Sequence, residues 1–466
     1  MALPWRILVV GGGVAGLAGA RAALLRAREL GRDVRIAVVE RAPRFGGVLV
    51  TERVDGFLLD AGADSWVVTK PQATALARAL GLGGALMGTR PENRRFYIGW
   101  GDRLHSVPEG LVLGVPTRIR PLIGTRLFTW RGKARMALEP LVPVRRFEGD
   151  DDESIADFAT RRLGREAAER LVAPLLGGVS AGDASDISVR AAFPQLVAME
   201  QEHGSLVRGM LVARRARSGA SPFMSLEGGT HALVDALVDR LREEGVSLRS
   251  GMPVEGLARA EHPEGGWSVR LEGGERLEAD AVLLAAPAYA AAKLVADVDA
   301  ELARALASIA FGSSTTVFLG YRRSDVAHPL DGVGFVVPRT AGRAIMACTW
   351  ISSKWEGRAP EGHVLLRVFV AGVDRDDASL VSAARAELAT LMGIDAAPTM
   401  TRVFRFDHSS AQMRVGHLVT LRTIRRRLRE AAPGLRVAGG GYDGVGIPDC
   451  IRQGEESGRA LADEAR

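Results

Sequence analysis

The sequence predicts an α/β fold: a Rossmann-like unit opens the chain, later segments rejoin it, and a helical insertion and a mixed sheet lie between them. Two observations at the start of the chain carry this prediction. An apolar run at residues 6–10 leads into a glycine-rich turn at 11–16 and then into an Ala/Leu/Arg stretch with a helical pattern up to Leu30. A second apolar run, 34–39, ends in Glu40. This order of strand, glycine turn, helix, strand and acid is typical of a dinucleotide-binding unit.

Each part of this unit has a physical role in binding a dinucleotide. Gly11 makes the tight turn, Gly13 lets a pyrophosphate approach the backbone, and Gly16 lets the helix pack against the strand. The helix N-terminus offers unpaired N–H groups to the phosphates, and Glu40 accepts hydrogen bonds from the ribose hydroxyls. The residues expected to bind the dinucleotide here are Gly11, Gly12, Gly13, Val14, Ala15, Gly16, Glu40 and Arg41.

A second glycine pair, Gly46-Gly47, follows Glu40 closely and precedes the segment "VTERVDGFLLDAGADSW" at 50–66. This arrangement resembles flavoprotein oxidases, in which the second pair continues the contact with FAD. In an NAD enzyme the chain more often goes straight into another helix. The alternative is a turn without a ligand. The further residues expected to contact FAD are Gly46, Gly47, Val48, Gly62, Ala63, Asp64 and Ser65.

The rest of the chain predicts a discontinuous FAD-binding domain with two insertions. Strand runs such as "ADAVLLAAPA" and an amphipathic helix pattern in "HALVDALVDRL" continue the FAD domain. The helical insertion carries Pro-rich, Arg-bearing loops, and the substrate-binding insertion alternates strands with a helix near 376–392. The expected boundaries are 1–88, 225–297 and 405–466 for the FAD-binding domain, 89–205 for the helical domain, and 206–224 and 298–404 for the substrate-binding domain.

Composition narrows the function classes. The 466 residues are 47% hydrophobic and 25% charged, which is ordinary for a globular protein of two or three domains. Only two cysteines occur, and the N-terminus goes directly into a strand pattern, so a reducing cytoplasm is expected. The net charge is +6, but the sequence has no zinc-ligand spacing, no RNA-binding aromatic signature and no long basic tail. Nucleic acid is therefore not an expected partner. The eight histidines form no HxxxH or HExxH pair, so no metal site is expected.

Motifs along nearly the whole chain resemble the oxygen-dependent protoporphyrinogen oxidase and coproporphyrinogen III oxidase family, most of all its Gram-positive coproporphyrinogen III oxidase branch. These are haem-biosynthesis flavoproteins of the amine-oxidase-like superfamily. The motifs at 174–183 and 193–194 are specific to this family. The matching stretches are "VVGGGVAGLA", "RFGG", "AGADSW", "LHSVPEGLVLGVPTRIRP", "PLLGGVSAGD", "ISVRAAFP", "EHGSL", "LEGGTHALVDAL", "ADAVLLAAPA", "GFVVP", "MACTW" and "GYDGVGIPDC".

The resemblance implies a six-electron oxidation of a porphyrinogen to the porphyrin, with FAD bound non-covalently and oxygen reduced to hydrogen peroxide. It also explains the glycine-rich segment "GGGYDGVGIPDC" at 439–450. In such families this segment returns to the FAD domain and begins a helix whose N-terminus points at the pyrimidine end of the isoalloxazine. That end becomes negative on reduction, which the helix N-terminus favours. The FAD contacts implied in the later parts of the chain are Val254, Phe406, Gly441, Val445, Gly446 and Ile447.

The same resemblance implies roles at the substrate. Arg94 matches an arginine that holds a propionate in the protoporphyrinogen branch, and Lys70 matches a lysine of the Gram-positive coproporphyrinogen branch. Val179 and Phe369 match positions that line the macrocycle cavity. Asp64, next to the expected flavin, is the candidate catalytic residue: it would orient a pyrrole N–H or help remove its proton. The alternatives are surface cations, a turn-stabilising aspartate and ordinary core residues.

Departures from the family pattern keep the substrate open. The chain has Ser180 and Met413 where relatives commonly have tyrosine, and Phe406 where they have tryptophan. The expected activity is oxidation of coproporphyrinogen III to coproporphyrin III. The alternatives are oxidation of protoporphyrinogen IX, a flavin-binding protein that no longer turns over porphyrinogen, and an amine oxidase on the same scaffold. An amine oxidase would need an aromatic cage, and the C-terminal third is poor in aromatic residues.

The expected partners follow from the same family. They are the porphyrinogen, oxygen and the next haem-pathway enzyme, ferrochelatase. The longest apolar run, 281–292, is broken by Pro287 and closed by Lys293, so no transmembrane segment is expected, and any membrane contact would be peripheral. A monomer and a homodimer both remain open.

Overall fold

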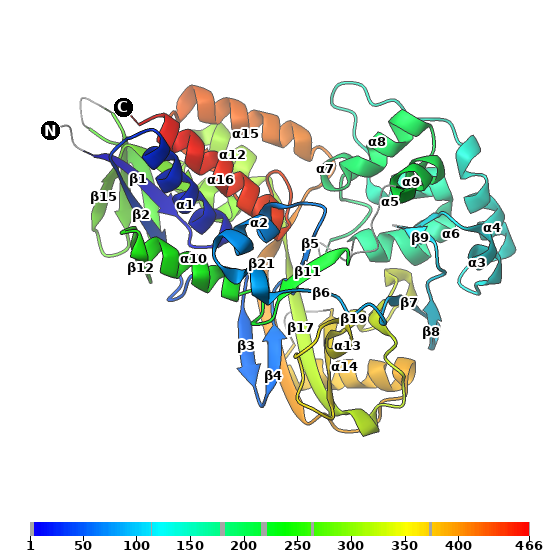
Figure 1. The fold of residues 1–466 in the computed structure, drawn as a ribbon. Helices are drawn as coiled ribbons and strands as arrows, with labels where there is room; N and C mark the ends of the chain where they lie inside the picture. Colours follow the sequence, from blue (N-terminus) through cyan, green and yellow to red (C-terminus); the bar gives the residue numbers. More distant parts are fainter. Residues whose placement is uncertain are drawn as a thin grey trace.

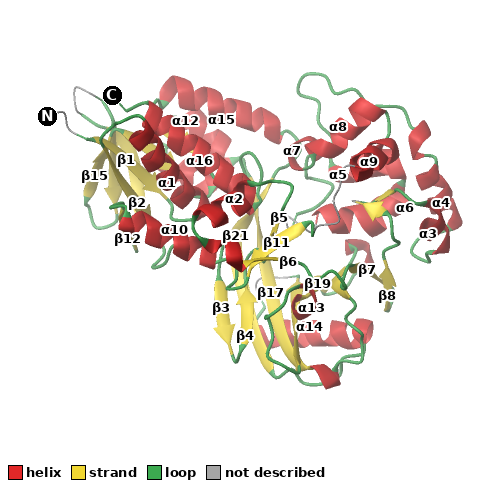
Figure 2. Ribbon diagram, in the orientation of Figure 1, coloured by secondary structure: helices red, strands yellow, loops and turns green. Residues whose placement is uncertain are grey.

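The computed structural model describes residues 4–112, 114–177, 182–215, 221–261, 265–371 and 375–465. The ribbon has three parts: an α/β part that holds both chain ends, a large sheet with one long helix, and a helical part (Figure 1). Strands are concentrated in the first two parts (Figure 2). Within the described ranges, no helix is long and apolar enough to cross a membrane.

The α/β part is built on a parallel sheet of five strands in the order β12-β2-β1-β16-β22. The predicted opening unit is confirmed, because β1 is followed by α1 and then by β2. Later segments join this unit from the middle and from the end of the chain. The bounds are β1 (Trp5–Val10), α1 (Val14–Glu29), β2 (Val34–Glu40), β12 (Ser247–Ser250), β16 (Ala281–Leu284) and β22 (Leu435–Val437).

Alternating side chains of the central strand β1 bury opposite faces of this sheet. Ile7 and Val9 belong to the core under α1, α10 (Ala232–Glu243) and α16 (Ile447–Asp463). Leu8 and Val10 belong to the core on the other face, together with residues of α11, α12 and α15. The bounds of these three helices are α11 (Ala288–Leu294), α12 (Ala300–Ala307) and α15 (His417–Ala431). Both faces are covered by helices, as expected for a parallel sheet.

Glycine allows α16 to lie directly on α1. A Cβ atom at Gly454 would fall 2.0 Å from the carbonyl oxygen of Ala15, and a Cβ atom at Gly458 would fall 2.1 Å from that of Gly19. No side chain fits between two backbones at such distances, so the glycines in α16 fix the close approach of the two helices. The last helix of the chain is thereby placed beside the first glycine turn, as Figure 1 shows.

The second part is a mixed sheet of seven strands in the order β21-β17-β20-β19-β18-β7-β8. One face packs against α14 (Asp377–Met392), which lies where the sequence predicts a helix. Two long strands, β17 and β21, pair antiparallel along most of their length and reach back toward the α/β part (Figure 1). The bounds are β7 (Arg95–Trp100), β8 (Arg103–Ser106), β17 (Ala310–Arg322), β18 (Gly332–Val336), β19 (Ile345–Trp350), β20 (His363–Val370) and β21 (Met400–Gln412).

Two elements of this sheet lie outside the range 298–404 expected for the substrate-binding insertion. β7 and β8 come from the segment expected to be helical, and β7 pairs in parallel with β18. The strand β21 continues past residue 405, where the last part of the FAD-binding domain was expected to begin. Backbone pairing over long sequence separations decides both placements, and local sequence patterns do not report such pairing. The other expected domain boundaries remain a prediction.

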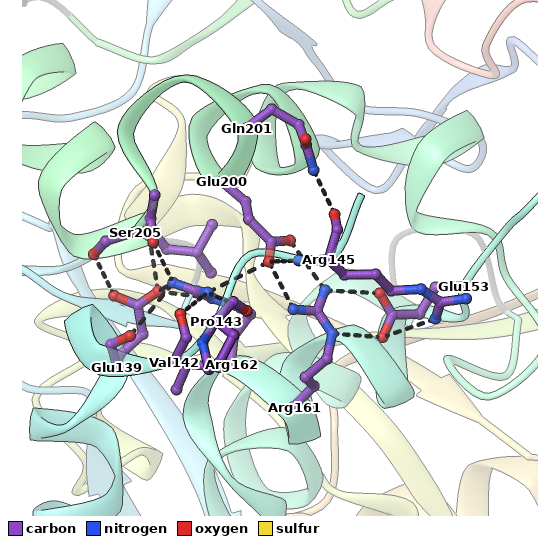
Figure 3. A network of polar contacts seen from close by, with 12 residues as sticks. Glu139, Val142, Pro143, Arg145, Glu153, Arg161, Arg162, Glu200, Gln201 and Ser205 are labelled. Atoms are coloured by element: carbon purple, nitrogen blue, oxygen red, sulfur yellow. Dashed lines mark hydrogen bonds and ion pairs between the residues drawn. The ribbon is translucent and has the colours of Figure 1, made fainter. Parts of the chain in front are cut away.

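The third part is helical and has its own core, which includes Phe158, Leu171 and Leu196. This part also contains a network of largely buried charges, drawn in Figure 3, that joins Arg161 and Arg162 to three glutamates. The helical elements are α3 (Ile119–Gly124), α4 (Trp130–Ala137), η2 (Glu139–Leu141), α5 (Ile155–Leu163), α6 (Arg165–Ala167), η3 (Ala168–Gly177), α7 (Val189–Ala192), α8 (Pro194–His203) and α9 (Leu206–Arg215).

Candidate functional site

The first glycine turn has the geometry of a phosphate site. Gly11 has a φ of 112°, and a Cβ atom there would fall 2.7 Å from the carbonyl carbon of Ala285. A Cβ atom at Gly16 would fall 2.0 Å from the carbonyl oxygen of Gly11. A Cβ atom at Gly13, in contrast, would meet no described heavy atom within 4 Å, so the space in front of the turn is open. Among the described residues, no side chain caps α1 and no acid lies in its first turn. The N–H groups of that turn, which includes Val14 and Ala15, therefore fit a pyrophosphate.

Glu40 ends β2 beside this turn. One carboxylate oxygen accepts a hydrogen bond from the Gly12 N–H (2.7 Å) and the other accepts one from the Ala42 N–H (2.8 Å). These bonds orient the carboxylate, and each oxygen keeps a lone pair for a ribose hydroxyl. The backbone N–H of Met252 donates to the Glu40 carbonyl (2.8 Å). This bond brings the start of β13 (Val254–Arg259) to the expected nucleotide end, and Arg41 is exposed next to it.

The second glycine pair lies against the first turn. The Gly46 N–H donates to the Gly12 carbonyl (2.8 Å), and Gly46 forms a parallel bridge with Gly13. Gly46 and Gly47 have φ values of 107° and 58°, which favour glycine. Arg44 braces this turn by donating to the Gly47 carbonyl (2.6 Å).

The loop at residues 60–65 follows the hairpin of β3 (Thr51–Val54) and β4 (Phe57–Asp60) and returns to this turn. A Cβ atom at Gly62 would fall 2.0 Å from the carbonyl oxygen of Val48, so the loop backbone touches the turn. The Ala63 carbonyl accepts a hydrogen bond from the Thr230 hydroxyl (2.8 Å), and the Ser65 hydroxyl donates to the Asp64 carboxylate (2.8 Å). The two stretches of predicted contact residues, 46–48 and 62–65, are thereby brought together.

Asp64 is held by two donors, from the last residue of the short helix α13 (Ile351–Lys354) and from the residue that follows it. Its Oδ2 atom accepts from the Lys354 ammonium (2.7 Å) and from the Trp355 indole N–H (2.9 Å). Burial by itself raises the pKa of Asp64, but Lys354, Trp355 and Arg367 outweigh it and hold that pKa far below its usual range. A carboxylate so stabilised is a poor proton acceptor. Of the two roles expected for Asp64, the geometry therefore favours orientation over proton removal.

The glycine-rich C-terminal segment leads into α16. Gly441 has a φ of 101°, and a Cβ atom there would fall 2.8 Å from the Cβ atom of Ala411, so the segment packs on β21. Gly446 is the N-cap of α16, and its N–H donates to the Asp449 carboxylate (3.3 Å). Val445 precedes this cap, and Ile447 is the first, buried residue of the helix. The start of α16 packs against β5 (Trp66–Val67), which directly follows the 60–65 loop.

The structure gives Lys70 a partner within the chain. Its ammonium lies 2.7 Å from both carboxylate oxygens of Asp449, in the first turn of α16. The lysine side chain is half exposed, whereas that of Asp449 is 10% exposed. Lys70 was expected to meet a substrate carboxylate, and here it meets the acid beside the expected flavin end. Its substrate role remains a prediction.

The other predicted residues lie on three different elements. Arg94 is exposed in the turn before β7. Phe369 on β20 is half buried, with the Arg367 guanidinium 4.6 Å from its ring centre, and Phe406 on β21 is half buried. Met413 is buried, and its carbonyl accepts from the Ser188 N–H (2.8 Å). Val179 and Ser180 lie outside the described residues.

The residues that sequence reasoning missed are the cations facing the 60–65 loop: Lys354, Arg358 and Arg367. The sequence offered one signal for Lys354. Lysine is rare in this chain, which has only four, and Lys354 directly precedes Trp355. The arginines gave no such signal, since arginine is abundant throughout the chain. The described residues contain no group of three or more His, Cys, Asp or Glu side chains placed to hold a metal ion.

Comparisons with known proteins agree with this geometry. The family model described as flavin containing amine oxidoreductase matches residues 14–462. The chain is 35% identical to a coproporphyrinogen III oxidase of Bacillus subtilis (strain 168) over 462 residues, 96% of each chain. It is 31% identical to the protoporphyrinogen oxidase of Bos taurus over 97% of each chain.

Solved structures show the same fold. The crystal structure of a putative protoporphyrinogen oxidase from Exiguobacterium sp. 255-15 matches with a TM-score of 0.87 and 32% identity, over 100% of both chains. A reduced UDP-galactopyranose mutase matches with a TM-score of 0.70 at 16% identity and shares the fold alone. The predicted fold class and the predicted family resemblance are both confirmed.

Proposed function

Because the chain belongs to the family of flavin-containing amine oxidoreductases, we propose that it is an FAD-dependent oxidase that converts coproporphyrinogen III to coproporphyrin III in haem biosynthesis. The observation that carries the substrate is the similarity to coproporphyrinogen III oxidases over nearly the full length, in Bacillus subtilis and also in Staphylococcus aureus (30% identity). The flavin itself follows from the family, and the open glycine turn with the oriented Glu40 supports FAD as its form.

Bound FAD supplies the hydride acceptor, and the chain positions the reactants around it. Three two-electron steps remove six electrons in all: three hydrides leave meso carbons, and the three accompanying protons are two pyrrole N–H protons and one proton from the fourth meso carbon. Three oxygen molecules take up these electrons and protons and leave as hydrogen peroxide. The uncapped end of α1 would hold the pyrophosphate and Glu40 the ribose. The start of α16 would face the ring, and Asp64, kept ionised by Lys354, would accept a hydrogen bond from a pyrrole N–H and so orient the macrocycle.

Oxidation of protoporphyrinogen IX is the second candidate function. The similarity to the Bos taurus protoporphyrinogen oxidase and the presence of Arg94 favour it. A flavin-binding protein without porphyrinogen turnover is the third, because Ser180 and Met413 depart from the family pattern. The proposal also includes a cytoplasmic location, delivery of the product to ferrochelatase, and a monomer or homodimer with at most peripheral membrane contact.

A direct assay separates these three candidates. The purified, flavin-loaded protein is mixed with each porphyrinogen in aerated buffer, and porphyrin fluorescence and hydrogen peroxide are followed together. We expect a higher kcat/KM for coproporphyrinogen III. A higher value for protoporphyrinogen IX would establish the second candidate. The third candidate would be established if the protein holds flavin but porphyrin fluorescence increases no faster than in a protein-free control.

We expect the FAD to be bound non-covalently, because no Cys or His lies in an evident flavin-linking motif. Acid precipitation should release the yellow flavin into the supernatant, where chromatography identifies FAD. Flavin that stays on the precipitated chain would contradict the prediction, and release of FMN would contradict the choice of cofactor.

We expect Arg94→Ala to weaken substrate binding more than turnover. An arginine–carboxylate pair that is partly desolvated contributes on the order of 1–3 kcal/mol, so KM should rise roughly 5- to 100-fold. The change in kcat should be smaller, because a remote carboxylate is bound alike in the ground and transition states. Arg103→Ala, at an exposed arginine in the neighbouring strand β8, is the matched control. Equal KM values for the wild type and Arg94→Ala would remove Arg94 from the site.

A further inference from the structure

The 60–65 loop joins the two ends of the proposed flavin site. At its start, Gly62 touches the Val48 carbonyl in the turn that lies on the phosphate-binding glycines. At its end the chain enters β5 and reaches Lys70, whose ammonium is paired with the first turn of α16. The loop therefore runs from the pyrophosphate end to the flavin-ring end. Side chains that hold this loop act on the border of the ring site.

Arg367 holds the first half of the loop through its backbone. Its guanidinium donates to the carbonyls of Ala61 (2.6 Å) and Gly62 (2.6 Å) and to that of Asp60 (3.2 Å). The arginine is 7% exposed and comes from β20 in the seven-stranded sheet. Burial lowers the pKa of Arg367 to about 10, which leaves the guanidinium positive at neutral pH. Three consecutive carbonyls are thus fixed by one cation from the other sheet.

Two more cations of the same segment hold the acids of the loop. Arg358 is 1% exposed, pairs with the Asp60 carboxylate (3.3 Å) and donates to the Leu226 carbonyl (2.9 Å). Lys354 pairs with Asp64 (2.7 Å), and both of their side chains are at most 15% exposed. The cluster formed by Asp60, Asp64, Lys354, Arg358 and Arg367 therefore contains one more cation than carboxylates. Little water reaches these charges, so their field is screened less than that of surface charges.

We propose that the 354–367 segment is a positioning and charge-setting device for the flavin ring. Lys354, Arg358 and Arg367 hold the 60–65 loop in place and leave an excess positive charge beside the ring, which favours its reduction. This inference rests on the proposed function only for the location of the flavin. In this proposal Lys354 and Arg367 are positioning residues. The charges of Asp64 and Lys354 help to set the reduction potential of the bound flavin.

The test is the reduction potential of the bound flavin in Asp64→Asn, Lys354→Met and the double variant, by equilibrium titration against a reference dye. Asp64→Asn removes a negative charge and should raise the potential. Lys354→Met removes a positive charge and should lower it, because Trp355, Ser65 and Arg367 still stabilise the Asp64 carboxylate. The double variant should return close to the wild-type potential. Lys293→Met, at an exposed lysine on α11, is the control and should change nothing.

Opposite shifts in the two single variants support the proposal, because a purely structural pair would give shifts in the same direction or none. Shifts of the same sign, or no shift, overturn it. If Lys354→Met does not fold, Asp64→Asn alone tests the proposal. Asparagine is nearly isosteric with aspartate, and this variant must still raise the reduction potential of the flavin. The titration uses no porphyrinogen, so a failure of the proposed substrate leaves its outcome unchanged. Loss of protease protection at the 60–65 loop in the flavin-free Lys354→Met protein gives an independent readout of the positioning role.

Discussion

Arg162→Met should lower the free energy of unfolding of the helical part by about 3–5 kcal/mol, the usual effect of removing one partner from a buried ion pair. Arg162 and its partners Glu139 and Glu200 are 0% exposed (Figure 3). The Arg162 Nε–H donates to Glu139 (2.8 Å), and other N–H groups of the same guanidinium donate to Glu200 (3.3 Å) and to the carbonyl of Val142 (3.0 Å). Without this guanidinium, the Glu139 carboxylate stays in the interior and has no other ion-pair partner among the described residues.

The network also explains why the effect should extend beyond one helix. Glu139 accepts from the Leu206 N–H (2.8 Å) at the start of α9, and Glu200 on α8 pairs with Arg161 (2.6 Å), so the network ties η2, α5, α8 and α9 together. The measurement is the urea midpoint of the far-ultraviolet circular dichroism signal. Arg165→Met, an exposed arginine a few residues further on, is the matched control and should leave the midpoint unchanged. An unchanged midpoint in Arg162→Met would show that the network does not stabilise the fold.

Gly13→Val should weaken flavin binding strongly while the protein stays folded. The Cβ atom at Gly13 would meet no described heavy atom within 4 Å, and the φ of −73° suits any residue, so the fold should tolerate valine. The added methyl groups would occupy the place where the pyrophosphate must approach the end of α1. Loss of two charge-assisted hydrogen bonds, each on the order of 1.5 kcal/mol or more, would weaken binding about 100-fold.

The flavin content of the purified variant and its thermal midpoint without flavin give the two readouts. Gly84→Val is the matched control, because a Cβ atom at Gly84 also meets no described heavy atom within 4 Å and this glycine belongs to η1 (Leu82–Ala85), outside both glycine turns. Gly84→Val should keep its flavin. Normal flavin content in Gly13→Val would place the pyrophosphate elsewhere and would contradict the interpretation of the first glycine turn.

The parts of the fold that the sequence predicts correctly are those with local signals. The strand–turn–helix–strand unit, the glycine turn and the helix at 377–392 are each encoded by residues close together in the chain. The assignment of β7 and β8 could not be predicted in this way. β7 pairs with β18, which lies far away in the sequence, and β8 joins the sheet only through β7, so a local pattern does not report which sheet this hairpin joins.

The same distinction applies to the site. The glycine positions and Glu40 were predicted, because their roles depend on a short motif. The surroundings of Asp64 and Lys70 were not, because Lys354 is 290 residues from Asp64, and Asp449 is 379 residues from Lys70. A motif can show that a residue lies near the flavin, but only the tertiary structure shows which charge it faces. Of the two roles expected for Asp64, that charge favours orienting the substrate over accepting its proton.

The most direct test of the proposed function is a single reduction of the protein-bound flavin by substrate without oxygen. The flavin-loaded protein is mixed anaerobically with coproporphyrinogen III in a stopped-flow cell, and the visible flavin absorbance is followed. Spontaneous oxidation of the porphyrinogen by air cannot contribute under these conditions. We expect the flavin absorbance to bleach and to return when oxygen is admitted. Flavin that stays oxidised in the presence of both coproporphyrinogen III and protoporphyrinogen IX, yet is bleached by dithionite, would contradict porphyrinogen oxidation as the function of this protein.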